Sequence, residues 1–287
     1  MEPWQDRRPE ISELEFELWR DLIEARCGTR FTETRMLYLT RCLWQRMREV
    51  GVKSYGDYYR RVVYGAVGEG EWEVLLELLL NRETGFFRHP PSYQALTTRV
   101  IPELVAARSR QGIRALTFWS AGCSTGQEPY SLAMVLRSST DATRWEVKVC
   151  GSDVSETALA EARRGCYKAA AVQAVPPEYR DRFLTVSENG TGVCYRISSE
   201  LRAIVQLGKL NLTQPATYWV GEQDVIFCQN VLIYFRPERR VEVVGELVRR
   251  LRPGGYLFLA PGEVVGLKLP GVKSVHFDNS LAYQRIG

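Results

Sequence analysis

The chain has 287 residues, of which 45% are hydrophobic and 25% are charged, so it can bury one sizeable core and a smaller second one. Its net charge of +4 is too small to indicate nucleic-acid binding. No run approaches the roughly 18 apolar residues that a membrane span needs, and the polar N-terminus does not resemble a signal peptide. We therefore expect a cytoplasmic protein without membrane insertion.

The number and spacing of the cysteines and histidines disfavour several kinds of structural and metal site. The seven cysteines are scattered and include no C-x-x-C pair, which favours neither a disulfide framework nor a zinc site, so we expect reduced, mostly core thiols. Only His89 and His276 are present, which excludes a histidine-rich metal centre, and we expect no metal. His89 precedes two prolines and is expected at the surface or between domains.

Four amphipathic helices are predicted in the first 85 residues. Ser12 and Glu15 form a capping box for a helix over residues 12–26, and Gly28 ends it. Ser54 with Asp57 opens the third helix. The apolar stripes of the first, second and fourth helices are Leu14, Leu18 and Leu22; Met36, Leu39, Leu43 and Met47; and Trp72, Leu75, Leu76, Leu79 and Leu80. Residues 1–85 are therefore expected to form an all-α domain.

A linker and lead-in helix are expected over residues 86–112. After them the spacing of the hydrophobic residues changes from that of helices to that of alternating strands and helices. Short β-rich runs then alternate with helical segments, as in ALTFWSAG, a helix from Pro129, WEVKVCGSD and a helix from Ser155. Later come DVIFCQN, a helix opened by Pro237, GYLFLAP, and two final runs typical of an antiparallel edge hairpin. This order predicts a doubly wound α/β domain over residues 113–287, with a small β insertion at about 168–205.

The most informative segment is WSAGCSTGQEPYSLA, residues 119–133, which joins the first strand to its helix. Gly122 and Gly126 permit a tight turn and let the backbone approach a ligand before Pro129. The G-x-x-x-G spacing is not the dinucleotide fingerprint G-x-G-x-x-G, and no P-loop occurs, so neither NAD nor ATP is favoured. A nucleotide-like group is predicted at this turn, and a plain strand–helix turn is the alternative.

Asp153 ends the second predicted strand. A carboxylate at this place in a doubly wound sheet can accept hydrogen bonds from both hydroxyls of a ribose. The alternative is a helix N-cap before Glu156. Together with the glycine turn, Asp153 predicts an adenosyl ligand at the carboxyl edge of the sheet.

Five motifs in order resemble the CheR family of chemotaxis-receptor methyltransferases: TGFFR (84–88), AGCSTGQEPYSLA, GSDVS, KLNL (209–212) and IFCQNVLIYF (226–235). The resemblance covers residues 80–287 closely, and the helical domain is similar to that family's receptor-facing domain. It implies a Rossmann-like class I fold and methyl transfer from S-adenosylmethionine to receptor glutamates. The products would be glutamate methyl esters and S-adenosylhomocysteine. The implied partner is the cytoplasmic helical region of methyl-accepting receptors, and we expect a monomer.

The resemblance also implies roles for individual residues. The implied donor-binding residues are Thr84, Arg88, Gly122, Glu128, Asp153, Asn211, Leu212, Asn230 and Val231. Glu128 would contact the donor's amino-acid end, and Asn211 and Leu212 would flank the adenine. Arg88 and Tyr234 are the implied catalytic pair, and we expect both to be buried beside aromatic neighbours. Neighbours expected in the core are Phe86, Phe87, Ile233 and Phe235.

Two positions depart from the family pattern. Position 82 is Arg where Asn is more frequent, and position 229 is Gln where Arg is common. Both adjoin the implied pocket, so they bear on substrate preference more than on reaction type. A regulator that binds donor or receptor without turnover therefore stays an alternative. A nucleic-acid methyltransferase is disfavoured, because its Asn/Asp-Pro-Pro-aromatic element is absent and only Val-Pro-Pro-Glu occurs at 175–178.

The expected reaction needs few specialised side chains, because a glutamate nucleophile is already ionised at pH 7 and no general base is required. Alignment of nucleophile and methyl group then supplies much of the rate enhancement.

Basic residues are concentrated in residues 26–61, with nine basic side chains against three acidic ones. We expect this basic patch to steer docking of a glutamate-bearing receptor helix, and solvated helix faces are the alternative. The basic members are Arg26, Arg30, Arg35, Arg41, Arg46, Arg48, Lys53, Arg60 and Arg61.

Overall fold

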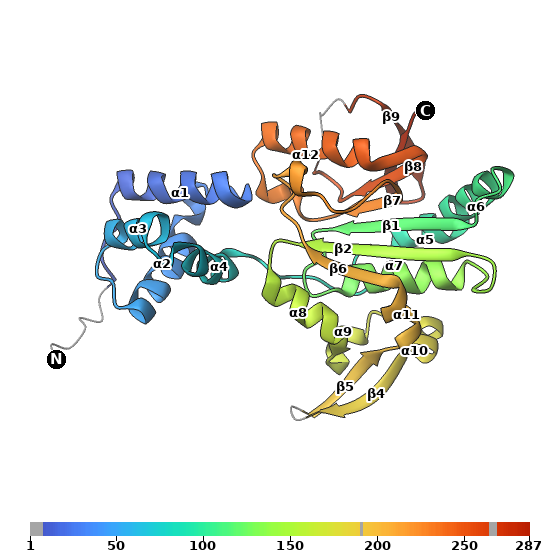
Figure 1. Ribbon diagram of the computed structural model, residues 1–287, viewed down its shortest axis with the longest axis horizontal. Coiled ribbons are helices and arrows are strands. Elements are labelled where there is room, and N and C mark those ends of the chain that lie inside the picture. The colour runs from blue at the N-terminus through green and yellow to red at the C-terminus, as the bar shows by residue number, and fades with distance from the viewer. Residues whose placement is uncertain (1–7, 190–191, 264–268) are drawn as a thin grey trace. The chain divides into compact units, whose positions relative to one another are not determined.

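The computed structural model describes residues 8–189, 192–263 and 269–287. The chain divides into two compact units, Met1–Asn81 and Arg82–Gly287, and each is described by itself (Figure 1). No helix within the described ranges is both long and apolar enough to cross a lipid bilayer.

The N-terminal unit is all-helical, as predicted. Its helices are α1 (Glu13–Cys27), the 3₁₀ turn η1 (Glu33–Arg35), α2 (Met36–Val50), α3 (Tyr55–Tyr64) and α4 (Gly68–Leu79). The predicted capping box at Ser12 is confirmed, since its side chain accepts from Glu15 N while the Glu15 side chain accepts from Ser12 N. Ser54 caps α3 in the same way by accepting from Asp57 N.

The predicted apolar stripe of α1 is wrong. Leu14 and Leu18 are 66% and 42% exposed, and α1 instead buries Phe16, Trp19 and Ile23. Trp19 is completely buried and donates its indole N–H to the Tyr55 carbonyl oxygen. Both faces of α1 have helical spacing, and the aromatic face removes more apolar surface from water.

A buried ionic group ties α2, α3 and α4 together. Arg46 Nε donates to Glu71 Oε1 at 2.7 Å, and the Tyr58 hydroxyl donates to the same oxygen at 2.7 Å. Glu71 is 6% exposed, so its charge is balanced inside the unit. Arg46 therefore serves the fold of this unit, although its sequence position had assigned it to the docking patch.

The C-terminal unit is built on a mixed sheet. Among the described residues the sheet has seven strands in the order β6-β2-β1-β7-β8-β10-β9 (Figure 1). The strands are β1 (Ala115–Ala121), β2 (Glu146–Asp153), β6 (Val205–Lys209), β7 (Gln223–Cys228), β8 (Leu251–Leu259), β9 (Val272–Phe277) and β10 (Ser280–Arg285). The pairs from β6 to β8 are parallel, and β10 and β9 form the predicted antiparallel edge hairpin. The order reverses direction at β1, which makes the sheet doubly wound.

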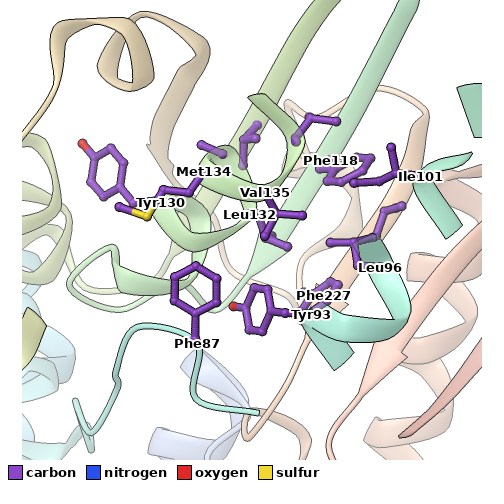
Figure 2. Packing of buried hydrophobic residues seen from close by; sticks show 14 of the residues in the cluster. Phe87, Tyr93, Leu96, Ile101, Phe118, Tyr130, Leu132, Met134, Val135 and Phe227 are labelled. Carbon is purple, nitrogen blue, oxygen red and sulfur yellow. The ribbon is translucent and has the colours of Figure 1, made fainter. Parts of the chain in front are cut away.

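Two hydrophobic cores cover the faces of this sheet. Successive strand residues point to opposite faces, so Phe118 and Phe227 join one core while Trp119 and Ile226 join the other. Figure 2 shows the first core, where Tyr93 lies beside Phe87 and Phe227. The helices of the unit that pack around the sheet are α5 (Pro90–Ala95), the π-helical turn η2 (Leu96–Val100), α6 (Ile101–Arg110), α7 (Gln127–Ser138), α8 (Glu156–Arg164) and α12 (Pro237–Arg250).

Among the residues that the structure describes, the predicted β insertion is a separate antiparallel sheet of three strands in the order β3-β5-β4. It also contains short helices, which the sequence pattern did not predict. Its elements are β3 (Cys166–Tyr167), α9 (Ala169–Val172), α10 (Pro177–Phe183), β4 (Leu184–Asn189), β5 (Gly192–Ile197) and α11 (Ser199–Ile204).

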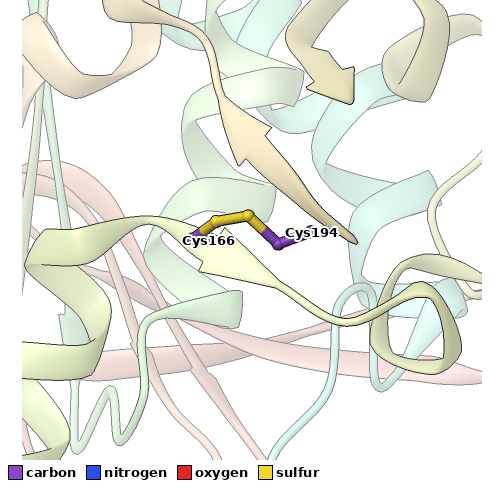
Figure 3. The surroundings of a disulfide bond; sticks show 2 residues. All are labelled: Cys166 and Cys194. Atoms are coloured by element: carbon purple, nitrogen blue, oxygen red, sulfur yellow. A yellow bond between two sulfur atoms is a disulfide. The ribbon is translucent and has the colours of Figure 1, made fainter. Parts of the chain in front are cut away.

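The expectation that all cysteines are reduced is wrong at one place. Cys166 of β3 and Cys194 of β5 form a disulfide bond, with their Cα atoms 5.7 Å apart (Figure 3). The two residues are 28 positions apart and become neighbours only when β3 pairs with β5. The other five cysteines are free and buried, as expected.

Candidate functional site

The carboxyl ends of β1, β2 and β7 meet at one edge of the sheet, where the glycine turn lies. Gly122 and Gly126 have φ values of +89° and +95°, a region that side chains with a Cβ rarely adopt. A Cβ on Gly122 would lie 2.4 Å from Val231 Cγ2, and one on Gly126 would lie 2.6 Å from the Ala162 Cβ. Both glycines are therefore required by conformation and by close packing.

The helix after this turn begins two residues earlier than predicted, at Gln127. Gly126 is the N-cap, so Pro129 occupies the third helical position. The missing N–H of a proline is tolerated there, because the first amides of a helix have no partner within it. Unbonded amides at a helix start favour a bound anionic group.

Asp153 links the glycine turn to the start of α8. Its Oδ2 accepts from Ser124 N at 2.8 Å, and its Oδ1 accepts from Ser155 N at 2.9 Å. The N-cap of α8 is Ser155, whose hydroxyl accepts from Ala158 N, so Asp153 is not the cap. A carboxylate offers about four lone-pair positions, so one carboxylate can accept several hydrogen bonds at once.

Glu128 lies on the first turn of α7, partly buried below the glycine turn. Its Oε1 accepts from the Ser120 hydroxyl at 2.6 Å. Burial raises the pKa of this carboxyl to about 7, with a smaller raising effect from the charge of Glu263. The Ser120 hydrogen bond and the charge of Arg88 act in the opposite direction on the pKa. The site therefore holds a carboxyl group that titrates near neutrality.

Arg88 is more exposed than expected. Its side chain is 40% exposed, and it pairs with Glu83 at 3.2 Å and donates to the Glu83 carbonyl oxygen at 2.9 Å. The preceding residues are the anchored ones, as predicted: Phe86 and Phe87 are buried, and Phe87 N donates to the Ser131 hydroxyl on α7. The aromatic pair anchors the segment, so the guanidinium can point to solvent.

The segment after β7 forms another wall of the site. Asn230 has a φ of +61°, and Val231 packs against Gly122. The 3₁₀ turn η4 (Leu232–Tyr234) follows, and Tyr234 is partly buried there. Phe235 is buried as expected, but Ile233 is 50% exposed and does not belong to the core, because a short 3₁₀ turn cannot bury all its apolar residues on one face.

Asn211 and Leu212 follow β6 at the same edge. The backbone N–H of Leu210 donates to the Asp153 carbonyl oxygen, which holds this segment against the end of β2. Asn211 Oδ1 accepts from Thr213 N at 3.0 Å, and Leu212 is 6% exposed. The Tyr218 hydroxyl donates to the Leu212 carbonyl oxygen at 2.7 Å.

The two departing positions are both engaged with the surrounding structure. The Arg82 carbonyl oxygen accepts from the Ser124 hydroxyl at 3.2 Å, and its guanidinium lies 4.0 Å from Glu161. Gln229 Nε2 donates to the Ser92 hydroxyl at 3.1 Å, and the same hydroxyl lies 2.8 Å from His89 Nδ1. His89 is thus a half-buried neighbour of the start of α5 rather than a ligand candidate. Thr84 is partly buried in the lead-in segment.

Sequence reasoning missed two residues at this edge. The Tyr167 hydroxyl donates to the Thr125 carbonyl oxygen at 2.8 Å and so supports the glycine turn. Glu263, 2% exposed, follows β8 and is close enough to Glu128 to raise the pKa of its carboxyl. The signal for Glu263 was available, because a carboxylate four residues after the end of a strand and two after a proline lies at the edge where ligands bind. Within the described part of the chain, no cluster of His, Cys, Asp and Glu could hold a metal ion.

Comparison with known proteins gives two consecutive family matches. The family described as CheR methyltransferase, all-alpha domain, matches residues 14–80, and CheR methyltransferase, SAM binding domain, matches residues 82–278. Chemotaxis protein methyltransferase 1 of Pseudomonas aeruginosa is 31% identical over 88% of this chain and 90% of its own. Chemotaxis protein methyltransferase Cher2 of Pseudomonas putida is 30% identical over 94% and 98%. The chemotaxis protein methyltransferase of Escherichia coli is 30% identical over 88% and 85%.

Proposed function

Since the chain belongs to the CheR methyltransferase family, we propose that it transfers a methyl group from S-adenosylmethionine to glutamate side chains of chemotaxis-type receptors. The products are glutamate methyl esters and S-adenosylhomocysteine. The proposed partner is the cytoplasmic helical region of the receptor, and the enzyme acts in the cytoplasm as a monomer. Relatives named chemotaxis protein methyltransferase, matched over most of both chains, support this proposal.

The observation that carries the donor site is the glycine turn held between Asp153 and Val231. In our proposal Asp153, which Ser124 N and Ser155 N hold in place, accepts from the ribose hydroxyls. Asn211 and Leu212 flank the adenine, and Asn230 and Val231 close the pocket. Thr84 faces the donor from the lead-in segment.

Glu128 is proposed to bind the ammonium group of the donor's methionine part. A cation beside a partly buried carboxyl favours the ionised form of that carboxyl. In the unliganded protein the pKa of Glu128 is about 7, so a bound ammonium group would lower this pKa. The amides at the start of α7, after Gly126, are proposed partners for the donor's own carboxylate.

Arg88 is proposed to hold the substrate glutamate. Its present partner is the exposed Glu83, whose side chain is 73% exposed, so an incoming carboxylate can take over this guanidinium with little loss of buried contacts. A guanidinium binds a carboxylate through two parallel hydrogen bonds, which fixes the angle of attack. The nucleophile is ionised at pH 7, so Tyr234 has only to orient the methyl group or donate to the spectator oxygen.

The test is transfer of labelled methyl groups to candidate receptors, followed by release of the label in base, which is diagnostic of methyl esters. Arg88→Lys keeps the charge but loses the planar fork, so turnover should fall while S-adenosylhomocysteine affinity stays nearly unchanged. The matched control is Arg99→Lys, which alters another exposed arginine–glutamate pair, with Glu103. Donor binding without ester formation on any receptor would replace this proposal with a regulator that does not turn over. Wild-type turnover in Arg88→Lys at saturating substrates would remove Arg88 from catalysis.

A further inference from the structure

Tyr167 connects the glycine turn to the β insertion. Its hydroxyl donates to the Thr125 carbonyl oxygen at 2.8 Å, and its side chain is 7% exposed. Its ring meets the Phe86 ring edge-on, with the ring centroids 4.9 Å apart. A Cβ on Gly126 would lie 2.9 Å from the Tyr167 hydroxyl, so the turn and the tyrosine fit each other closely. A displaced Tyr167 would therefore leave the turn without this hydrogen bond and this packing.

The strand that carries Tyr167 is short. β3 has two residues, and both of them pair with β5. Next to these pairs, Ile197 N–H donates to the Gly165 carbonyl oxygen at 2.9 Å. A segment held by so few hydrogen bonds opens locally at a low cost in free energy. The position of Tyr167 therefore depends on how firmly β3 is held against β5.

The disulfide between Cys166 and Cys194 joins these same two strands covalently (Figure 3). Cys166 immediately precedes Tyr167, and the two cysteines are 28 positions apart. A cross-link over such an interval restricts the conformations that the segment can reach when its strands separate. With the disulfide formed, β3 stays beside β5 and Tyr167 stays within reach of Thr125. With both thiols reduced, hydrogen bonds and packing alone hold β3.

The disulfide is open to thiol chemistry from one side. Cys194 is 6% exposed, whereas Cys166 is half-buried, so a thiol or disulfide in solution reaches the Cys166 sulfur first. Under the proposed function the enzyme acts in the cytoplasm. Thiols are kept reduced there, and the disulfides that form are mostly transient or redox-sensing. We therefore expect this bond to form and break with the redox state of its surroundings.

We propose that Cys166 and Cys194 are a reversible oxidation site that controls donor affinity, because their disulfide fixes Tyr167 against the glycine turn. The proposal rests on the proposed function for the donor as the ligand and for the cytoplasm as the location. In oxidation, the Cys166 thiolate attacks a small-molecule disulfide, whose S–S bond breaks and releases one thiol. The Cys194 thiolate then attacks the mixed disulfide at Cys166 and releases the second thiol. The two cysteines lose two electrons and two protons, which the small disulfide gains, and a dithiol reverses both steps.

The test measures binding of labelled S-adenosylhomocysteine to the chain oxidised with glutathione disulfide and to the chain reduced with dithiothreitol. Thiol titration identifies the two states, since five cysteines are free beside the disulfide and the chain has seven in total. The reduced chain should bind about fivefold more weakly, which is the effect of one lost buried hydrogen bond. Peptides covering residues 121–128 should also exchange their amide hydrogens faster in the reduced chain.

Two variants and two matched controls trace the route of this effect. Cys194→Ser should bind like the reduced wild-type chain under both conditions. Tyr167→Phe should do the same, because it lacks the hydroxyl that supports the turn. Cys42→Ser removes a buried thiol of the N-terminal unit, and Tyr256→Phe removes a buried hydroxyl that donates to Glu103 at 2.5 Å. Both controls should keep the redox response of the wild-type chain.

Equal affinity and equal exchange in the oxidised and reduced wild-type chain overturn the proposal, and so do seven titratable thiols after oxidation. A redox response that persists in Cys194→Ser also overturns it, because other thiols would then cause the effect. A full response in Tyr167→Phe overturns the route through the tyrosine. If Cys194→Ser does not fold, the reduced wild-type chain gives the same comparison without a substitution.

The outcome is separate from that of the proposed function. If the wild-type chain methylates no receptor but binds S-adenosylhomocysteine more tightly when oxidised, the function fails and the oxidation site stands. If neither state binds S-adenosylhomocysteine, the control of donor affinity is overturned together with the donor site. Hydrogen exchange in residues 121–128 then shows whether the disulfide still stabilises the glycine turn.

Discussion

Donor affinity should depend steeply on pH because of Glu128. Burial raises the pKa of this carboxyl to about 7, so its ionised fraction falls from about 0.76 at about pH 7.5 to about 0.03 at about pH 5.5. If only the ionised form binds the donor's ammonium group, the affinity should decrease about 25-fold over this range. Most of that decrease should occur just below pH 7.

The stability of the unliganded fold should depend on pH with the opposite sign. The pKa of Glu128 is higher in the folded chain than its ordinary value of 4.5, so the folded state binds more protons between pH 4.5 and about 7. Its contribution to the free energy of unfolding is therefore present at low pH and lost as the pH rises through 7. Donor binding and intrinsic stability should thus respond to the same proton in opposite directions.

The assay is calorimetric titration with S-adenosylhomocysteine at constant ionic strength, with Glu128→Gln as the control. The control should bind weakly at every pH, with a nearly flat profile. A wild-type affinity that does not change between these pH values, in a folded protein, would refute the role of Glu128. A steep profile that survives in Glu128→Gln would assign the titration to another group, and Glu263, whose pKa burial also raises, would be the first to examine.

Four further predictions concern single contacts. Gly122→Ala should weaken S-adenosylhomocysteine binding at least tenfold, because about 1–2 kcal/mol of backbone strain is added to a clash with Val231. The control Gly254→Ala, whose Cβ would meet no atom within 4 Å, should bind S-adenosylhomocysteine as tightly as the wild-type chain. Asp153→Ala should lose most donor affinity and also stability, since Ser124 and Ser155 lose their acceptor, and unchanged affinity would remove it from the site. Charge reversal at both Arg41 and Arg48, exposed and on one face of α2, should weaken receptor binding most at low salt, and a salt-independent loss would contradict steering. Cys194→Ser should lower the free energy of unfolding by about 3–4 kcal/mol only without reductant, and a difference that persists in reductant would point to packing instead.

Local signals in the sequence were the most reliable. The capping residues Ser12 and Ser54 were predicted because their partners lie three positions away. The alternation of strands and helices gave the α/β fold, since each strand carries its own pattern. At the carboxyl edge, the glycine turn and Asp153 were recognisable because a doubly wound sheet always brings the ends of its central strands together.

The wrong predictions share one physical origin. Alternative contacts compete for the same residues, and a local sequence pattern does not show which contact forms. Leu14 and Leu18 have helical spacing, yet the opposite face of α1, which carries Trp19, is the face that is buried in the core. Arg88 follows two buried phenylalanines, but the anchored pair leaves its own side chain free to reach Glu83. The disulfide depends on a contact between distant segments, which no single stretch of sequence reveals.

The parallel pairing of β1 with β7 has a consequence for the order of events during synthesis. β1 pairs early with β2, but Thr117 N–H donates to Asp224 across 107 residues, and Val231 reaches Gly122 over a similar interval. A nascent chain that ends before β7 therefore has the glycine turn and Asp153 but lacks the wall that closes the pocket. Such non-local pairings form slowly, because loop closure precedes their stabilising contacts. Capture of labelled S-adenosylhomocysteine by ribosome-bound chains of increasing length would consequently report when β7 has docked against β1.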